Sequence, residues 1–291
     1  MKVATFHIDG AHHVGVVDGE EIADVTAADA SLGPDVGAVL AAGALDRVAD
    51  VASRAPRRPL ADVTLAAPVL RPPKFLAIGL NYAAHVAETG AKPPEHQLWF
   101  NKQSTCVIAT GEPIHVPKAS SVVDYEGELG FVIGRRCRHV PKERAAEVIA
   151  GYTIVNDVSV RDWQVRSPTM TMGKSFDTHG PVGPWLVTSD EVGDPHRLHL
   201  RTWVDGELRQ DSHTDDLVFD CFDMVEHLST AFTLEPGDVI ATGTPSGVGI
   251  AMKPPRLLAA GSVVRVEIEN IGVLENPVID EPESLASGAA R

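Results

Sequence analysis

Along most of the chain, apolar and polar residues alternate, or short apolar runs lie between turn residues. This pattern predicts many short strands and few helices. Apolar runs predict strands that begin at Lys74, Val123, Gly151 and Leu234. Asp-Gly pairs predict hairpin turns at 9–10, 18–19 and 205–206. Apolar residues at helical spacing predict helices or helical turns within 36–51, 81–90, 141–150 and 219–232. The expected class is α+β and mainly β.

Prolines divide the chain into parts. Residues 1–70 are expected to form a small β-rich unit, with a linker-like segment at Ala55–Pro59, and Arg71-Pro72-Pro73 precedes the main body. The main body is expected to span residues 71–280. Residues 281–291 are small and polar, so we expect a flexible tail there.

The predicted strand Val123–Gly134 carries two carboxylates two positions apart. Side chains alternate between the faces of a strand, so Glu126 and Glu128 point the same way, and Asp124 can share their face. Anions gathered on one face cannot be buried without a cation, and a hard metal ion would supply it. An exposed acidic edge strand explains this segment equally well. Asp157, among apolar residues of the next strand, also needs a partner and is the third candidate ligand.

His85 and Glu88 follow the end of the predicted strand 74–80. Residues three apart share one face of a helical turn, so Glu88 can orient the imidazole as a proton acceptor. An exposed helical His/Glu pair is the alternative.

Two further loops carry candidate groups. The loop 172–184 is rich in glycine and proline and holds Lys174, either a local cation for an anionic substrate or a solvated surface residue. The turn 242–249 offers successive backbone N–H groups as an anion-binding nest, to which the Thr244 hydroxyl could add a donor.

Between Gly90 and Pro117 the proline-punctuated sequence is either a substrate lid or a packed structural loop.

Composition narrows the classes of function. The 291-residue chain has a formal net charge of −15, which argues against nucleic acid or an anionic membrane as partner. Its 3 cysteines form no CxxC pair, so neither a disulfide framework nor a zinc ribbon is indicated. No apolar segment of the kind needed for a signal peptide or a membrane span was found, and we expect a cytoplasmic protein.

Five motifs in order resemble the fumarylacetoacetate hydrolase family over roughly residues 70–278. The motifs are Gly79-Leu80-Asn81-Tyr82 with His85 and Glu88; Asp124-Tyr125-Glu126-Gly127-Glu128-Leu129; Asn156-Asp157-Val158-Ser159-Val160-Arg161-Asp162 with Gln164; Gly173-Lys174-Ser175-Phe176-Asp177; and Thr242-Gly243-Thr244-Pro245-Ser246-Gly247-Val248-Gly249. The resemblance implies a mixed β-sandwich roll, usually a homodimer, that holds Mg²⁺ or Mn²⁺. Residues 1–70 resemble the accessory domain of some bacterial members.

Carried over residue by residue, the resemblance implies roles for the candidate residues. Glu126, Glu128 and Asp157 match the metal ligands, and His85 with Glu88 matches the dyad of the acylpyruvase-like branch. Arg161, Gln164, Lys174 and Thr244 match positions that hold substrate, and Lys174 is also expected to assist catalysis. Asp124 is left out of the ligand set.

The resemblance implies a metal-dependent hydrolase. It would cleave a C–C bond in an acylpyruvate-like 1,3-dicarbonyl 2-oxo acid through a metal-stabilised enolate, in the manner of aromatic catabolism. Oxaloacetate decarboxylation and isomerisation of a 2-hydroxymuconate-type diacid remain open, because both pass through the same enolate. From another class, a non-catalytic metal or ligand binder with this fold is the alternative. The partner is expected to be a small anionic 2-oxo acid.

Overall fold

A computed structural model describes residues 1–283. Its longest sheet has the strand order β4-β3-β2-β1-β14-β12-β11-β17-β6-β7, and β5 and β8 pair with it off this path. The five N-terminal strands are β1 (Lys2–Ile8), β2 (Ala11–Asp18), β3 (Glu21–Asp24), β4 (Arg57–Pro59) and β5 (Thr64–Ala66). The remaining strands of this sheet are β6 (Phe75–Gly79), β7 (Leu98–Lys102), β8 (Val107–Ile108), β11 (Gly127–Ile133), β12 (Ile149–Asn156), β14 (Gly180–Thr188) and β17 (Val239–Ala241).

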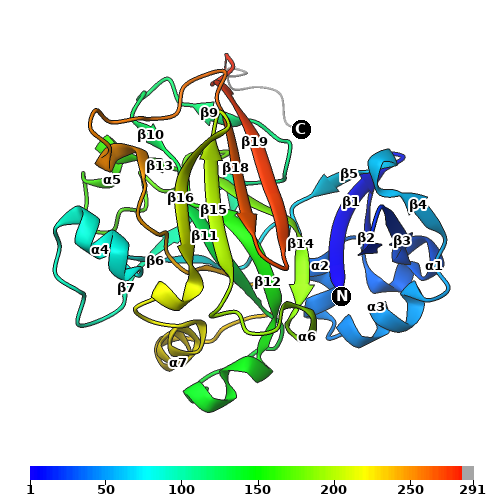
Figure 1. The fold of residues 1–291 in the computed structure, drawn as a ribbon. Coiled ribbons are helices and arrows are strands. Elements are labelled where there is room, and N and C mark those ends of the chain that lie inside the picture. The colour runs from blue at the N-terminus through cyan, green and yellow to red at the C-terminus, as the bar shows by residue number, and fades with distance from the viewer. Residues whose placement is uncertain (284–291) are drawn as a thin grey trace.

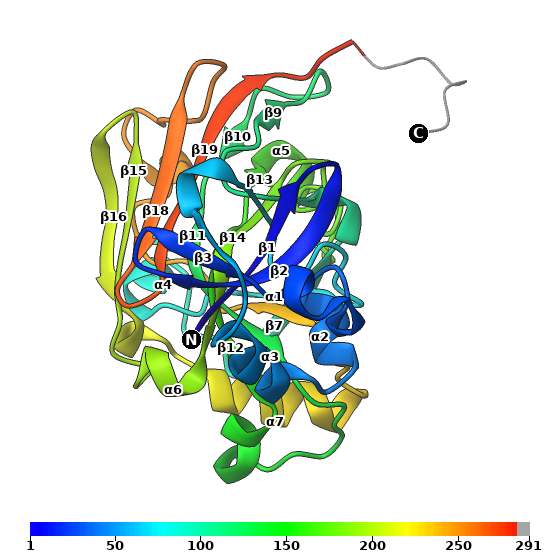
Figure 2. The same ribbon diagram turned by 90° about the vertical axis from the view of Figure 1, so that its right-hand side faces the viewer.

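A second sheet has the order β16-β15-β18-β19-β9 and lies over the first as a separate layer (Figures 1 and 2). Its strands are β9 (Ile114–Val116), β15 (His199–Val204), β16 (Glu207–His213), β18 (Val263–Ile268) and β19 (Gly272–Asp280). The main apolar core lies between the layers, where Leu129 and Phe131 of β11 belong to the same buried cluster as Leu200 and Val266. The predicted α+β, mainly β class is confirmed.

The N-terminal strands continue the main sheet. β1 pairs antiparallel with β14, with Lys2 opposite Val187 and Val3 opposite Leu186. A second buried cluster contains residues of both regions, among them Val3, Val39 and Leu186. In Figure 1 this region forms the blue lobe beside the two-layered body. The division near residue 70 stays a prediction.

The turn chemistry predicted from Asp-Gly pairs is confirmed at 9–10 and 205–206. Asp9 and Gly10 join β1 to β2 with φ of 51° and 83°, and Asp205 and Gly206 join β15 to β16 with φ of 54° and 77°. Both residues of such a turn need positive φ, which Asp tolerates and Gly adopts freely. The third predicted hairpin joins β2 to β3, but its turn is shifted by one residue: Asp18 pairs with Glu21, and Gly19, with a φ of 61°, forms the turn with Glu20.

The structure confirms some of the predicted helices and divides or shortens others. The segment 219–232 is confirmed as α7 (Cys221–Ala231), which Asp220 and Asp223 begin with a reciprocal capping box. Between 36 and 51 there are two helices, α2 (Val36–Ala41) and α3 (Leu45–Ala52), separated at Gly43 with a φ of 62°. The other short helices are α1 (Val25–Ala28), α4 (Ala83–Thr89), α5 (Arg161–Gln164) and α6 (Ser189–Val192).

The helix predicted at 141–150 is confirmed only in part, because it is shorter than predicted and of the 3₁₀ type. Residues Lys142–Glu147 form a 3₁₀ segment with no side-chain cap, and β12 begins at Ile149. Ile149 and Ala150 are buried in strand pairing, so their apolar character reflected the sheet and not a helix face. Among residues 1–283, no helix has the length and hydrophobicity needed to cross a membrane.

Gly151 in β12 provides a test of the central sheet. A Cβ at this position would lie 2.2 Å from the carbonyl oxygen of Val187 in the neighbouring β14, and that backbone cannot move aside. We expect Gly151→Ala to lower the free energy of unfolding by about 3 kcal/mol, measured by denaturant titration. In the control Gly79→Ala, the nearest atom is Leu98 Cδ2 at 3.4 Å, an ordinary contact, and a loss there equal to that of Gly151→Ala would contradict the steric argument.

Candidate functional site

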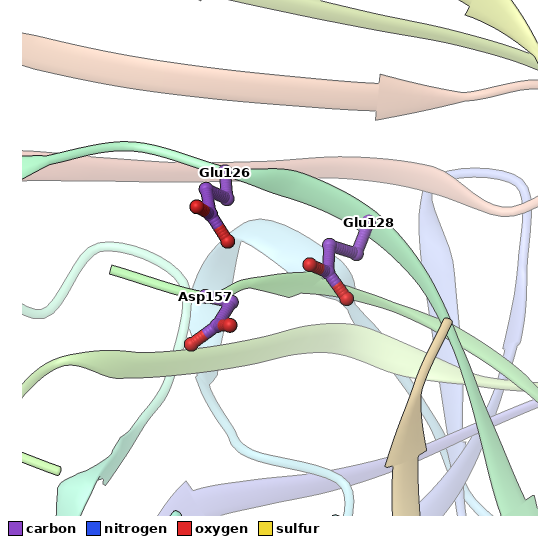
Figure 3. A group of neighbouring side chains, drawn as sticks. All are labelled: Glu126, Glu128 and Asp157. Atoms are coloured by element: carbon purple, nitrogen blue, oxygen red, sulfur yellow. The ribbon is translucent and has the colours of Figure 1, made fainter. Parts of the chain in front are cut away.

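Three carboxylates converge inside the main sheet (Figure 3). Glu126, Glu128 and Asp157 offer oxygen atoms that all lie within 4.8 Å of one another, and the three residues are 5%, 1% and 0% exposed. Their meeting follows from strand register, because Gly127 at the start of β11 lies opposite Asn156 at the end of β12. The Asp157 N–H also donates to the Glu126 carbonyl oxygen at 2.8 Å.

The strand predicted from Val123 to Gly134 is interrupted, and this corrects the position of Asp124. Val123–Asp124 form β10, which pairs with β13 (Ser159–Val160) and not with the main sheet. Asp124 is not one of the three clustered carboxylates, and Arg161 lies between it and Glu126. It accepts hydrogen bonds from the N–H groups of Gly249 at 2.8 Å and Ile250 at 3.0 Å and from Arg161 Nε at 2.9 Å.

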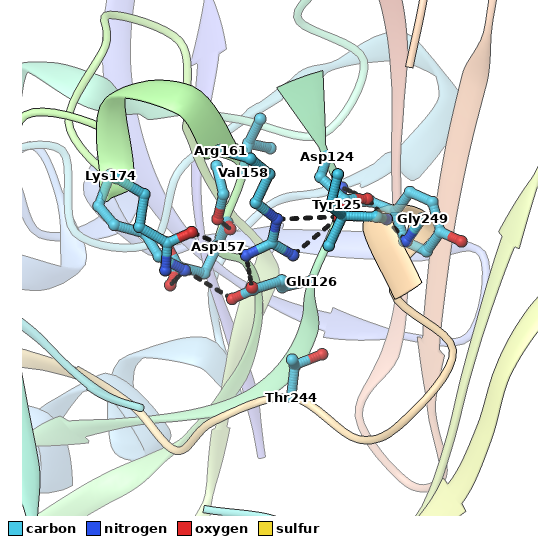
Figure 4. A network of polar contacts seen from close by, with 12 residues as sticks. Asp124, Tyr125, Glu126, Asp157, Val158, Arg161, Lys174, Thr244 and Gly249 are labelled. Atoms are coloured by element: carbon cyan, nitrogen blue, oxygen red, sulfur yellow. Dashed lines mark hydrogen bonds and ion pairs between the residues drawn. The ribbon is translucent and has the colours of Figure 1, made fainter. Parts of the chain in front are cut away.

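Buried cations neutralise two of the three clustered carboxylates (Figure 4). Lys174 Nζ lies 2.7 Å from Glu126 Oε2 and 2.7 Å from Asp157 Oδ2. Arg161 Nη1 donates to Glu126 Oε1 at 2.5 Å. Glu128 instead accepts the Gly243 N–H at 2.8 Å, and no Lys or Arg in residues 1–283 forms an ion pair with it. One buried carboxylate is thus left without a cationic partner.

The pKa values of the buried carboxyl groups follow from this unequal distribution of cations. Burial alone would raise the pKa of Glu126, but Lys174 and Arg161 outweigh burial and hold that pKa far below its ordinary value. For Glu128, burial and the charges of Asp157 and Glu126 all act in one direction and raise its pKa well above the ordinary value. Burial would lower the pKa of Lys174, but Asp157 and Glu126 raise it, so Lys174 is an ammonium ion.

The donor set fits a hard divalent cation. Three carboxylates supply the oxygen ligands that Mg²⁺ and Mn²⁺ prefer, and three protein ligands leave coordination positions for other groups. A cation among them would also balance the charge of Glu128, which the protein itself leaves uncompensated.

His85 and Glu88 form the predicted pair on α4. His85 Nδ1 is 2.9 Å from Glu88 Oε2, and Glu88 Oε1 accepts the Gly247 N–H at 2.8 Å. If Nδ1 carries the proton that Glu88 accepts, Nε2 is left as the acceptor nitrogen. The contact with Gly247 ties α4 to the loop 242–249, so both oxygens of Glu88 are held and the imidazole is oriented.

A cavity of about 650 Å³ unites most of the predicted site residues. Its lining includes these seven: His85, Glu126, Glu128, Arg161, Gln164, Lys174 and Thr244. The Thr244 hydroxyl donates to the Gly127 carbonyl oxygen at 3.0 Å and accepts from Gln210 Nε2 at 2.7 Å. Its hydroxyl proton therefore joins the loop to β11 in this structure. Glu88 and Asp157 do not line the cavity, but Glu88 contacts His85 and Asp157 contacts Lys174, which do.

Sequence reasoning missed Lys102. This side chain is fully buried at the end of β7 and donates to Asp157 Oδ1 at 2.7 Å, and it also contacts the Lys174 carbonyl oxygen. It holds a candidate metal ligand and the backbone of a candidate catalytic residue at once. The alternation of Leu98, Phe100 and Lys102 was the available signal, because it places the lysine on the same strand face as a buried phenylalanine.

The chain belongs to the fumarylacetoacetate hydrolase family, because residues 74–279 match the fumarylacetoacetate (FAA) hydrolase C-terminal family. It is 40% identical over 273 residues to the mitochondrial oxaloacetate tautomerase fahd2 of Xenopus laevis, covering 90% of this chain and 84% of that protein. The family and the fold type expected from the motifs are confirmed.

Two solved structures resemble the whole chain. A fumarylacetoacetate hydrolase from Exiguobacterium antarcticum has a TM-score of 0.87 at 38% identity, covering 97% of this chain and 100% of that chain. Maleylpyruvate hydrolase from Sphingobium sp. SYK-6, solved with manganese(II) and pyruvate, has a TM-score of 0.80 at 35% identity, covering 96% and 99%. The relatives are thus hydrolases and a tautomerase.

Replacing Glu128 tests the metal site. We expect Mn²⁺ at about 100 times its dissociation constant to stabilise the wild type by about 2.7 kcal/mol, seen as a rise in melting temperature. Glu128→Gln removes a ligand and should abolish most of that rise. Without metal, the variant should be at least as stable as the wild type at neutral pH, because burial and the charges of Asp157 and Glu126 force Glu128 to take up a proton on folding, and the amide needs none.

The exposed Glu143→Gln serves as the charge-matched control and should keep the full response to Mn²⁺. Equal metal-induced stabilisation of Glu128→Gln and the wild type would remove Glu128 from the ligand set.

Proposed function

We propose that the protein is a Mg²⁺- or Mn²⁺-dependent hydrolase that cleaves a C–C bond in an acylpyruvate-like 2-oxo acid. The observation that carries this proposal is the His85–Glu88 pair, which borders the same cavity as Glu126 and Glu128 and is fixed through Gly247. A general base held this way beside a carboxylate cluster suits activation of water. Bound by Glu126, Glu128 and Asp157, the divalent ion would polarise the 2-oxo group of the substrate.

The remaining steps are assigned to side chains of the chain itself. His85 takes a proton from water as the water oxygen adds to the distal acyl carbon, and Glu88 stabilises the imidazolium that forms. The adduct then collapses, the C–C bond breaks, and its electron pair moves into the pyruvate part as an enolate. The ammonium of Lys174 stabilises the negative charge that develops there. Protonation of the enolate carbon completes the release of a carboxylic acid and pyruvate.

Roles for Arg161, Gln164 and Thr244 in holding the substrate carboxylate are part of the same proposal. Their support is their place on the cavity lining and the family motifs. The homodimer, the cytoplasmic location and a place in aromatic catabolism rest on the family resemblance and the composition.

A second candidate is interconversion of the keto and enol forms of oxaloacetate. It is favoured by the tautomerase of Xenopus laevis, which matches 90% of this chain. The same His85 would then move a proton at the carbon next to the 2-oxo group, without attack by water. Decarboxylation of oxaloacetate is the related alternative, with CO₂ as its product.

Product analysis separates these reactions. Metal-stripped protein, with and without Mg²⁺ or Mn²⁺, is given acetylpyruvate and oxaloacetate in parallel, and products are identified by NMR. We expect acetate and pyruvate from acetylpyruvate, only with metal. His85→Gln should lower kcat roughly 10²- to 10⁴-fold, as loss of a general base does. His12→Gln, an exposed histidine on β2, is the control.

Other products would redirect the assignment. Ketonised oxaloacetate with no cleavage of acetylpyruvate would establish the tautomerase, and metal-dependent CO₂ from oxaloacetate would establish a decarboxylase. An unchanged kcat in His85→Gln would contradict the role of His85 as the base.

A further inference from the structure

Exposed apolar side chains gather at the cavity that holds the carboxylates. Among the large apolar residues that are exposed in residues 1–283, Leu98, Val165 and Ile250 are 41%, 82% and 41% exposed, and all three line this cavity. Leu80, Met170 and Val248 line the same cavity. An exposed apolar rim around a charged floor is costly in water, which indicates a surface that apolar ligand atoms cover.

The cations that line this cavity are already paired. Lys174 lies between Glu126 and Asp157, and Arg161 lies between Glu126 and Asp124 at 2.5 to 2.9 Å. His85 is held by Glu88. Within residues 1–283, the cavity lining contains no further Lys or Arg. A ligand that carried a second carboxylate away from the metal site would therefore meet aliphatic side chains.

The carboxylate of Asp124, whose contacts with Arg161 and Gly249 are drawn in Figure 4, connects two segments that carry rim residues. Asp124 accepts the Ile250 N–H at 3.0 Å on one side and Arg161 Nε at 2.9 Å on the other. Arg161 begins α5, and Val165 directly follows that helix. Because Asp124 is fully buried, its two contacts are shielded from water and connect the segments that carry Ile250 and Val165. Together with Leu98, these two residues are called the apolar wall.

We propose that this wall selects the substrate by its distal group. Resting on the proposed function, the inference is that acylpyruvates whose acyl group ends in an apolar chain or ring are preferred over those that end in a second carboxylate. Val165, Ile250 and Leu98 are the specificity-determining residues. Each methylene group that the wall covers should strengthen binding roughly fourfold.

Binding of inert analogues tests the inference without catalysis. Oxamate, N-butyloxamate and N-(2-carboxyethyl)oxamate share a 2-oxo-acid-like head and differ in the distal group. Calorimetric titration of Mn²⁺-loaded protein should show N-butyloxamate binding at least tenfold tighter than oxamate, and the carboxyethyl analogue no tighter than oxamate. Equal affinity of the butyl and carboxyethyl analogues would overturn the inference.

A charge placed on the wall provides the matched test. Val165→Lys should lower the butyl-to-carboxyethyl affinity ratio at least tenfold, because the ammonium favours the second carboxylate and disfavours the alkyl chain. Val263→Lys makes the same change at a residue of β18 that is 39% exposed and outside the cavity lining, and should leave the ratio unchanged. An unchanged ratio in Val165→Lys would overturn the inference.

Turnover of acetyl-, pentanoyl- and maleylpyruvate separates this inference from the proposed function. Turnover of all three without preference for pentanoylpyruvate would leave the hydrolase standing and overturn the inference. Tight N-butyloxamate binding, with the ratio altered by Val165→Lys and no hydrolysis of any acylpyruvate, would uphold the apolar wall and remove the hydrolase.

Discussion

The mutual repulsion of three buried carboxylates is the constraint on which the rest of this site depends. Glu126, Glu128 and Asp157 lie within 4.8 Å of one another with almost no contact with water. Such a group is stable only if cations or protons compensate it. Asp157 is paired with Lys102 and Lys174, and Glu126 is paired with Lys174 and Arg161. Glu128 has no cationic partner among the described residues, and its pKa is raised accordingly.

The two sheets hold the carboxylates where they are. Antiparallel pairing of β11 and β12 sets the distance between Glu128 and Asp157. The second sheet packs against Gly127, the residue between the two glutamates. A Cβ at Gly127 would lie 2.2 Å from Thr202 Oγ1 and 3.0 Å from Val266 Cγ1, both in the second sheet. Glycine between the two glutamates therefore allows the two sheets to pack closely at this point. The same residue thus serves both the packing of the sheets and the placement of the carboxylates.

The sequence predicted what depends on local rules. The Asp-Gly hairpins, α7, the clustering of Glu126 and Glu128 and the burial of Asp157 all follow from turn chemistry, two-residue periodicity or the cost of a buried charge. The predictions were wrong where the structure of a segment depends on which distant strand or side chain it pairs with. Ile149 belongs to a strand because β11 lies beside it, and Asp124 leaves the carboxylate face because β10 pairs with β13. Lys102 was missed because its partner, Asp157, lies 55 residues away in sequence.

Charge balance links the metal centre to the choice of substrate. Within the carboxylate cluster and the ion pairs that reach it, a network that does not include the His85–Glu88 pair, the four carboxylates of Asp124, Glu126, Glu128 and Asp157 outnumber the three cations Lys102, Arg161 and Lys174 by one. A divalent ion turns that deficit into a surplus of one positive charge, which the single carboxylate of a 2-oxo acid cancels. A second carboxylate would restore the deficit and would face the aliphatic side chains of Val165 and Ile250. The acidic cluster and the apolar wall thus favour the same ligand, one with a single negative charge at the metal and an uncharged distal end.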